Sequence, residues 1–401
     1  MQHNKRKGSL LVEAVVATGF IMLCFFVIDL FPFKFELAKP IKQDLQDFDV
    51  YDLHFSGKNI GRNTGDSNIV LVQLGNNRGE IASQIELLKK HQPAVIGVDI
   101  IFRDSSEDRA GDSALIESAK GAGSIVWGSL FEYDTSDKRS LTSSFFNTPD
   151  LSQRSGYINF IGNKYSVNRT FTPFLKFNDK EYGSFSARIL ERFAPDRYER
   201  LRNRNNSVET INYKGNLESF TNFSAKELNF YDETGQLEPK IRGKIVLLGF
   251  FNKEGSDVLE DLHFTPLNER VSGRSFPDMY GVVVHANIIS MLLEKRYIQT
   301  KSALFSYLLS VLFTFLFTLY IFSRYGKKAH PSHLLFILIQ IVLIILLTWL
   351  FLLLFSHFNI KVNLLPIIIT MALSVEMIVV YQKLARWLHK KWNYPTLFSK
   401  Q

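Results

Sequence analysis

Apolar runs of two different lengths divide the chain. Four runs are long, each near the length of about 20 residues that crosses a lipid bilayer; they are Leu10–Phe31, Ala303–Phe322, Leu334–Phe355 and Leu364–Tyr381. Residues 32–300, between the first and the second of them, carry only short apolar runs among many polar positions. The pattern predicts one transmembrane helix before a large folded domain and three transmembrane helices after it.

The short runs of the large domain predict an α/β fold. Ile69–Leu74 and Ala94–Val98 are apolar throughout, and Ile81–Lys90 between them places its apolar residues at helical spacing. Strand, helix and strand in about thirty residues is typical of a parallel βαβ unit. Ser124–Leu130 and Ile245–Gly249 have the same strand character. We therefore predict an α/β domain with a largely parallel central sheet, in which Ile69–Leu74, Ala94–Val98 and Ile245–Gly249 are neighbouring central strands.

Three further elements are expected from weaker patterns. Residues 48–55 alternate apolar and acidic positions, which favours an extended edge segment, and residues 156–160 and 167–171 alternate like the two arms of a hairpin. Gly281–Glu294 has the spacing of an amphipathic helix. No glycine or proline interrupts Lys295–Thr300, so the pattern favours a nearly straight helical connection to the second span.

The net charge of +8 is distributed in the way that membrane proteins distribute it. Basic residues gather before the first span, between the second and third, and after the fourth; they include Lys5, Arg6, Lys7, Arg324, Lys327, Lys328, Lys383, Arg386, Lys390 and Lys391. By the positive-inside rule, the N-tail (residues 1–9) and the basic C-tail (382–401) are cytoplasmic, and the domain is periplasmic or extracellular. We expect a lipid bilayer, not nucleic acid, as the partner of this charge. The first run is longer than a signal-peptide core, so we expect an uncleaved anchor.

The sequence offers little for catalysis. Cys24 is the only cysteine and lies in the first apolar run, so the domain forms no disulfide and no cysteine metal site. Residues 75–79 lack the lysine and the spacing of a phosphate-binding loop, and no Gly-x-Ser-x-Gly motif is present. We expect no catalytic residue, no metal and no cofactor, and hence no enzyme.

Six residues form the predicted ligand-binding set; they are Asp99, Asp104, Asp257, Asp261, His285 and Asn287. The first two follow a predicted strand, where ligands of parallel sheets bind beyond the carboxyl ends. The next two belong to an acidic run whose oxygens could hold a cation, and the last two begin the final helix of the domain. A structural role stays open for each: a helix cap or ion pair, an exposed polar turn, or a core position with satisfied hydrogen bonds.

Two blocks of sequence carry a more specific pattern. They consist of Pro93–Asp99 with Phe102 and Asp112–Leu115, and of Gly243–Gly249 followed by Asp257, Thr265, Pro266 and Gly281–Asn287. In this order and spacing they resemble the type-2 CHASE domain, an extracytoplasmic sensory domain of bacterial signalling proteins. The resemblance covers about Phe35 to Lys295, and one span before with three after is also similar to that family.

Two features depart from the resemblance. Family members joined to enzymes commonly carry acids at the end of the first core strand, where this chain has Gln73–Asn76. No cyclase, kinase or diguanylate cyclase domain follows the last span within these 401 residues. We therefore expect any output to come from a separate protein.

The resemblance implies a multi-pass protein of the bacterial inner membrane that senses a ligand or an envelope state. Its signal would pass through the spans to a separate cytoplasmic or membrane signalling protein. The alternative is a non-catalytic membrane scaffold or assembly factor that binds another envelope protein. The sequence leaves open the ligand, the partner and whether the chain forms a homodimer.

Overall fold

The computed structural model has two compact units, one of residues 43–298 and one of residues 1–42 with 299–401. The residues that the structure describes are 2–30, 49–56, 66–120, 124–133, 139–146, 154–160, 167–252, 261–268, 277–324 and 332–398.

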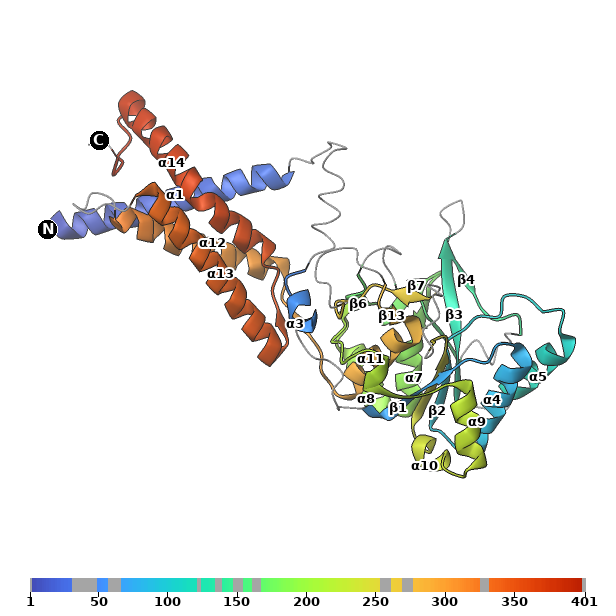
Figure 1. The fold of residues 1–401 in the computed structure, drawn as a ribbon. Helices are drawn as coiled ribbons and strands as arrows, with labels where there is room; N and C mark the ends of the chain where they lie inside the picture. The colour runs from blue at the N-terminus through green and yellow to red at the C-terminus, as the bar shows by residue number, and fades with distance from the viewer. Residues whose placement is uncertain are drawn as a thin grey trace. The chain divides into compact units, whose positions relative to one another are not determined.

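A seven-stranded sheet forms the centre of the first unit among its described residues (Figure 1). Its main path runs β10 (Phe220–Phe223), β1 (Asp66–Gln73), β11 (Ile245–Gly249), β2 (Val95–Val98), β3 (Ile125–Tyr133) and β4 (Arg139–Thr142), and β5 (Ser155–Tyr157) also pairs with β3. Every pairing is parallel except that of β3 with β4. The prediction of β1, β2 and β11 as neighbouring central strands is confirmed, with β11 between the other two.

Helices cover both faces of this sheet (Figure 1). One face packs under α4 (Arg78–Lys90), α5 (Arg109–Ala119), α9 (Ala225–Glu233) and α10 (Glu238–Ile241). The other face packs under α7 (Phe185–Phe193) and α11 (Gly281–Leu293), with α8 (Pro195–Asn203) beside them. The central strands are buried on both sides, which explains why they are apolar throughout.

Gly97 shows how closely α7 approaches the sheet. A Cβ atom at this position would lie 2.8 Å from side-chain atoms of Ile189 in α7 and Leu247 in β11. Strand residues alternate between faces, and Ile96 and Val98 belong to the core under α4 and α5. Gly97 and the next odd position, Asp99, therefore point to the face that α7 and α11 cover.

Shorter elements complete the unit: α3 (Asp52–Ser56), β6 (Thr170–Phe171), β7 (Phe174–Phe177), β8 (Lys180–Gly183), β9 (Glu209–Thr210), η2 (Leu217–Ser219), β12 (Leu262–His263) and β13 (Met279–Tyr280).

Two predictions from weak alternation were wrong. The expected hairpin does not form, because β5 joins β3 in parallel and β6 pairs with β9. The expected extended edge segment contains helix α3 instead, where Asp52 forms an ion pair with Arg169 at 2.6 Å. Alternation reports only that one side of a segment is buried, and these segments take their partners from distant parts of the chain.

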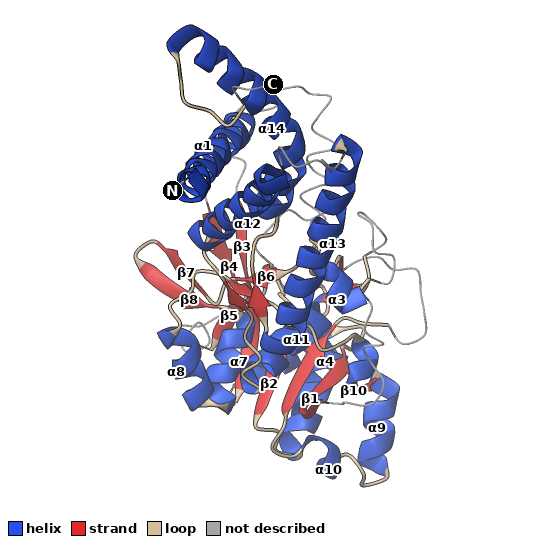
Figure 2. Cartoon of the chain, turned by 90° about the vertical axis from the view of Figure 1, so that its left-hand side faces the viewer, coloured by secondary structure: helices blue, strands red, loops and turns tan. Residues whose placement is uncertain are grey.

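Among its described residues, the second unit has four helices that are long and apolar enough to cross a membrane, and Figure 2 shows them. They are α1 (Gln2–Leu30), α12 (Ala303–Arg324), α13 (His333–Phe358) and α14 (Leu365–Trp392). Helix α14 packs against the other three, and α1 also packs against α12. Hydroxyl-bearing residues at every fourth position of α12, Ser306, Ser310, Thr314 and Thr318, are fully buried. Such small residues let membrane helices approach closely.

The segment between α11 and α12 is not helical, so the predicted straight connection was wrong. Helix α11 ends at Leu293, and Lys295 takes a left-handed backbone with φ of 59°. The chain then follows the surface of the domain, because the amide of Asn212 donates to the carbonyl of Arg296 at 3.0 Å and the guanidinium of Arg204 lies 4.3 Å from the Tyr297 ring centroid.

Backbone hydrogen bonds also fix the segment at which the chain enters the second unit after residue 298. Strand β14 (Gln299–Thr300) pairs in parallel with β15 (Ile360–Lys361), which lies between α13 and α14. The N–H of Gln299 donates to the carbonyl of Asn359 at 2.7 Å. Ile298, the last residue of the first unit, is 2 % exposed. Each side of the boundary between residues 298 and 299 is therefore anchored within its own unit.

Candidate functional site

Four ionisable side chains gather where the central strands end. Asp99 directly follows β2, and its N–H donates to the carbonyl of Leu248 in β11 at 2.8 Å. Asp261 and His263 belong to the β12 segment, and His285 lies in the second turn of α11. We call Asp99, Asp261, His263 and His285 the carboxyl-edge cluster, because parallel strands end together at one edge of their sheet.

The start of α11 is fitted closely to this cluster. The N–H of Gly281 donates to the carbonyl of Asp261 at 3.2 Å. A Cβ atom on Gly281 would lie 3.1 Å from the Asp261 carboxylate and 3.4 Å from Nε2 of His263. Asp261 takes a left-handed backbone with φ of 69°, and its carboxylate lies 3.7 Å from Nε2 of His263. Glycine therefore lets the helix terminus approach the polar groups.

His285 is the buried member of the cluster and is 3 % exposed. Its Nδ1 lies 3.1 Å from the hydroxyl of Ser186 in α7. The ring of Phe160 has its centroid 4.7 Å from His285 and 5.0 Å from His263. Burial is the main reason that the pKa of His285 is lowered to about 3, and the nearby His263 contributes to this lowering. His285 is thus neutral at physiological pH.

The pKa of Asp99 is shifted in the opposite direction to that of His285. Burial raises the pKa of its carboxyl well above the ordinary value, and the negative charge of Asp261 raises this pKa further. Two carboxylates that share one site repel each other, so the protonated form of one is favoured. The residue as a whole is intermediate in exposure, although its carboxyl is buried.

Sequence reasoning missed Asp278, which lies next to the cluster. Its carboxylate accepts hydrogen bonds from the N–H of Thr265 at 2.8 Å and from the Thr265 hydroxyl at 2.6 Å. Burial raises the pKa of Asp278 to about 6, although the bonds from Thr265 oppose this rise. A signal was available in the sequence, because the Thr265-Pro266 turn needed an acceptor for its hydroxyl.

The other predicted residues lie apart from the cluster or outside the described residues. Asn287 is fully buried, and its amide bonds only to backbone groups of residues 214, 215 and 283 and to the sulfur of Met279. It therefore holds the segment after β9 against α11. Asp257 lies outside the described residues. Within the described part of the chain, no three His, Cys, Asp or Glu side chains are placed to hold a metal ion.

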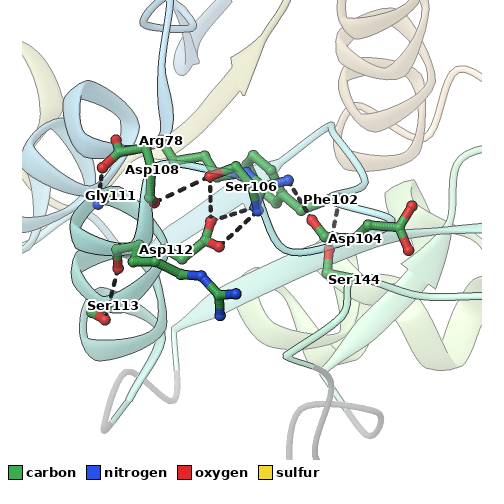
Figure 3. A network of polar contacts seen from close by, with 10 residues as sticks. Arg78, Phe102, Asp104, Ser106, Asp108, Gly111, Asp112, Ser113 and Ser144 are labelled. Carbon is green, nitrogen blue, oxygen red and sulfur yellow. Dashed lines mark hydrogen bonds and ion pairs between the residues drawn. The ribbon is translucent and has the colours of Figure 1, made fainter.

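Asp104 belongs to a second network, which Figure 3 shows. Arg78, at the start of α4, pairs with the Asp112 carboxylate in α5 and donates to the backbone carbonyl of Asp104 at 2.5 Å. Its guanidinium lies 5.4 Å from the ring centroid of Phe102. Ser106 also donates to Asp112, through its N–H at 2.8 Å and its hydroxyl at 3.0 Å. Burial works against a charged Asp112, but these bonds still lower its pKa.

This second network has a structural character. It ties the loop after β2 to the first turns of two helices, and the Asp104 side chain itself points away from Asp112 (Figure 3). The hydroxyl of Ser144 accepts from the N–H of Phe102 at 3.2 Å and fixes the base of the same loop. The network thus holds the chain that leaves Asp99 in one conformation.

A family model of the CHASE2 domain matches residues 43–322. The chain belongs to the CHASE2 domain family. This confirms the resemblance seen in the sequence, and CHASE2 is a family of extracytoplasmic sensory domains. The match also covers the linker and most of α12, so the CHASE2 pattern includes the first helix after the domain. Comparison with curated proteins and with solved structures found no match.

Helix α11 extends from the carboxyl-edge cluster to the end of residues 43–298. Its first turn contacts Asp261, as described above, and its last residues precede the linker to α12. Lys214 forms an ion pair with Glu294 at 2.7 Å, directly after the helix. With 13 residues, the helix extends about 20 Å. One rigid element therefore links the carboxyl-edge cluster to the exit of the domain.

Proposed function

We propose that this protein is a multi-pass sensor of the bacterial inner membrane, with both termini in the cytoplasm and the CHASE2 domain outside it. Four membrane-length helices and the placement of basic residues on alternate loops support this topology. The domain is proposed to detect a ligand or an envelope state and to signal to a separate cytoplasmic or membrane protein. We assign it no catalytic role.

The observation that carries the proposal is the proximity of Asp99 and Asp261 at the carboxyl edge. Burial and, to a smaller extent, the charge of Asp261 raise the pKa of Asp99, and a cationic or hydrogen-bond-donating ligand would relieve both effects. Asp261 also contacts the first residue of α11 through its carbonyl. A ligand that binds one position of α11 better than another would shift the balance between them, which is the only thermodynamic source of a signal.

The linker between α11 and α12 suggests the path by which a signal would leave the domain. In this proposal, a movement at the end of α11 passes along residues 295–298 to β14. Because β14 is bonded to β15, the force acts on α12 and also on the connection between α13 and α14. This route replaces the rotation of one continuous helix that the sequence pattern favoured.

A non-catalytic scaffold is the second candidate. Several polar groups of the domain, including Asn287, Asp278 and Asp112, already have protein partners, which favours a structural role for them. A scaffold would use its outer surface to bind another envelope protein, and the carboxyl-edge cluster would serve stability alone.

A thermal-stability screen of the full chain in nanodiscs distinguishes the two. Amines, amino acids, sugars, organic acids and divalent cations would be added in turn to wild type. Sensing predicts that one class raises the melting temperature and that Asp99→Asn and Asp261→Asn abolish the rise. The matched variant Asp104→Asn, in the other network, should keep it. If no class shifts wild type and crosslinking in cells captures an envelope protein on the domain, the scaffold account is correct.

A further inference from the structure

The chain turns back on itself after α14. Asn393 takes a left-handed backbone with φ of 53°, and its N–H donates to the carbonyl of His389. The next residues return along the helix, and the carbonyl of Tyr394 lies 2.7 Å from Nδ1 of His389. The Thr396 hydroxyl then accepts from the N–H of Phe398 at 3.3 Å. Residues 394–398 thus form a short folded segment, which we call the strap.

The strap reaches a buried acid on the first helix. Glu13 of α1 is 3 % exposed, although acids inside membrane helices are rare and face the bundle interior. Its Oε1 accepts from the hydroxyl of Tyr381 in α14 at 3.0 Å and from the hydroxyl of Thr396 in the strap at 2.8 Å. A buried carboxylate needs such donors, and the strap supplies one of the two.

An aromatic side chain closes the same contact. Phe398 is 3 % exposed, and its ring centroid lies 5.4 Å from that of Phe322 in α12 and 6.4 Å from that of Tyr381. Both pairs are nearly perpendicular, at 72° and 84°, a favourable arrangement for aromatic rings. The strap therefore contacts α1, α12 and α14 at once.

We propose that the strap is a detachable latch whose docking depends on the arrangement of α1, α12 and α14. Each helix supplies one part of the site: Glu13, Phe322 and Tyr381. A donor and an acceptor about 3.6 Å apart no longer form a hydrogen bond, and helix shifts of about 1–2 Å occur in switching proteins. A movement of any one helix would therefore release the strap and uncover Glu13. Only the use of this movement as a signal depends on the proposed function.

Carboxypeptidase digestion of the full chain in nanodiscs tests the latch. Mass spectrometry follows the trimming of the C-terminus with time, with the free peptide 388–401 as the reference for an undocked strap. In wild type, trimming should pause at Phe398, because a buried residue is cleaved only from the open form. Thr396→Val, Glu13→Gln, Phe322→Ala and Tyr381→Leu should each speed cleavage past Phe398 by roughly tenfold, the effect of losing about 1.4 kcal/mol of docking energy.

The controls separate docking from general loosening. Glu376→Gln changes another acid of α14, which pairs with His333 and not with the strap, and should leave the pause unchanged. Wild-type cleavage as fast as the free peptide would overturn docking. A pause that responds to Thr396→Val but to none of the three helix variants would overturn the dependence on helix arrangement. No ligand or partner is used, so failure of the latch leaves the sensing proposal standing.

Discussion

Asp261 lies close enough to Asp99 for its negative charge to raise the pKa of the Asp99 carboxyl. The two residues come from distant parts of the chain, Asp99 directly after β2 and Asp261 after β11, and these two strands are neighbours in the sheet. Their repulsion is maintained by the fold, since Asp261 is fixed at the start of α11 and the loop after Asp99 is held by Arg78 and Asp112. A ligand site at this position would therefore be preorganised by the fold.

Asp99→Asn should stabilise the domain, and the gain should grow with pH. The pKa of Asp99 is raised in the folded state. Its contribution to the free energy of unfolding is therefore fully present below the ordinary pKa of about 4 and is lost as pH rises through the folded pKa. Urea denaturation of both proteins at a series of pH values measures the difference. Equal midpoints at all pH values would show that the Asp99 carboxyl is neither destabilised by burial nor repelled by Asp261.

Val95→Asp should destabilise the domain by more than about 3 kcal/mol, because it places an unpaired charge in the centre of the sheet. Val95 is fully buried in β2. The neighbouring Ala94 is exposed, so Ala94→Asp is the matched control and should have little effect. Urea denaturation of the full chain measures both. Unchanged stability in the first variant would mean that this strand is not in the core.

Arg78→Ala and Asp112→Ala should each lower the denaturation midpoint, and the double variant should lower it by less than the sum. Arg78 and Ser106 bind Asp112 in one network. Either substitution therefore removes the interaction between Arg78 and Asp112, and the second substitution cannot remove it again. The pKa of Asp112 is lowered, so its contribution is present above the ordinary pKa and disappears as pH falls through the folded pKa. Additive effects at neutral pH would argue against the network.

The sequence predicted the central sheet well, because β1, β2 and β11 are buried on both faces and so carry an unmistakable apolar pattern. It also predicted Asp99, Asp261 and His285 as site residues, and the structure brings these three residues together. It failed at β5, at α3 and at the linker after Leu293. In those places the conformation is decided by distant partners such as Arg169 and Asn212, which no local pattern reveals.

Insertion of Gly-Gly-Ser between Ile298 and Gln299 should abolish signalling and leave both units folded. This peptide bond lies between two anchored segments, so the insertion breaks none of the contacts described above and only adds slack. The matched control is the same insertion after Gly235, an exposed turn between α9 and α10. Activity of a genetically identified partner, at matched expression, is the readout. Full activity with the inserted linker would favour the scaffold.

The most direct test of the central claim, an exported sensory domain carried on four spans, is the membrane topology. Reporter fusions that are active only outside the cytoplasm, and their cytoplasmic counterparts, would be placed at Gly162 in the domain, at Lys327 and at Asn359. The account predicts an outside signal at Gly162 and Asn359 and a cytoplasmic signal at Lys327. A cytoplasmic signal at Gly162 would contradict it, because a CHASE2 domain on that side could not receive a signal from outside the cell membrane.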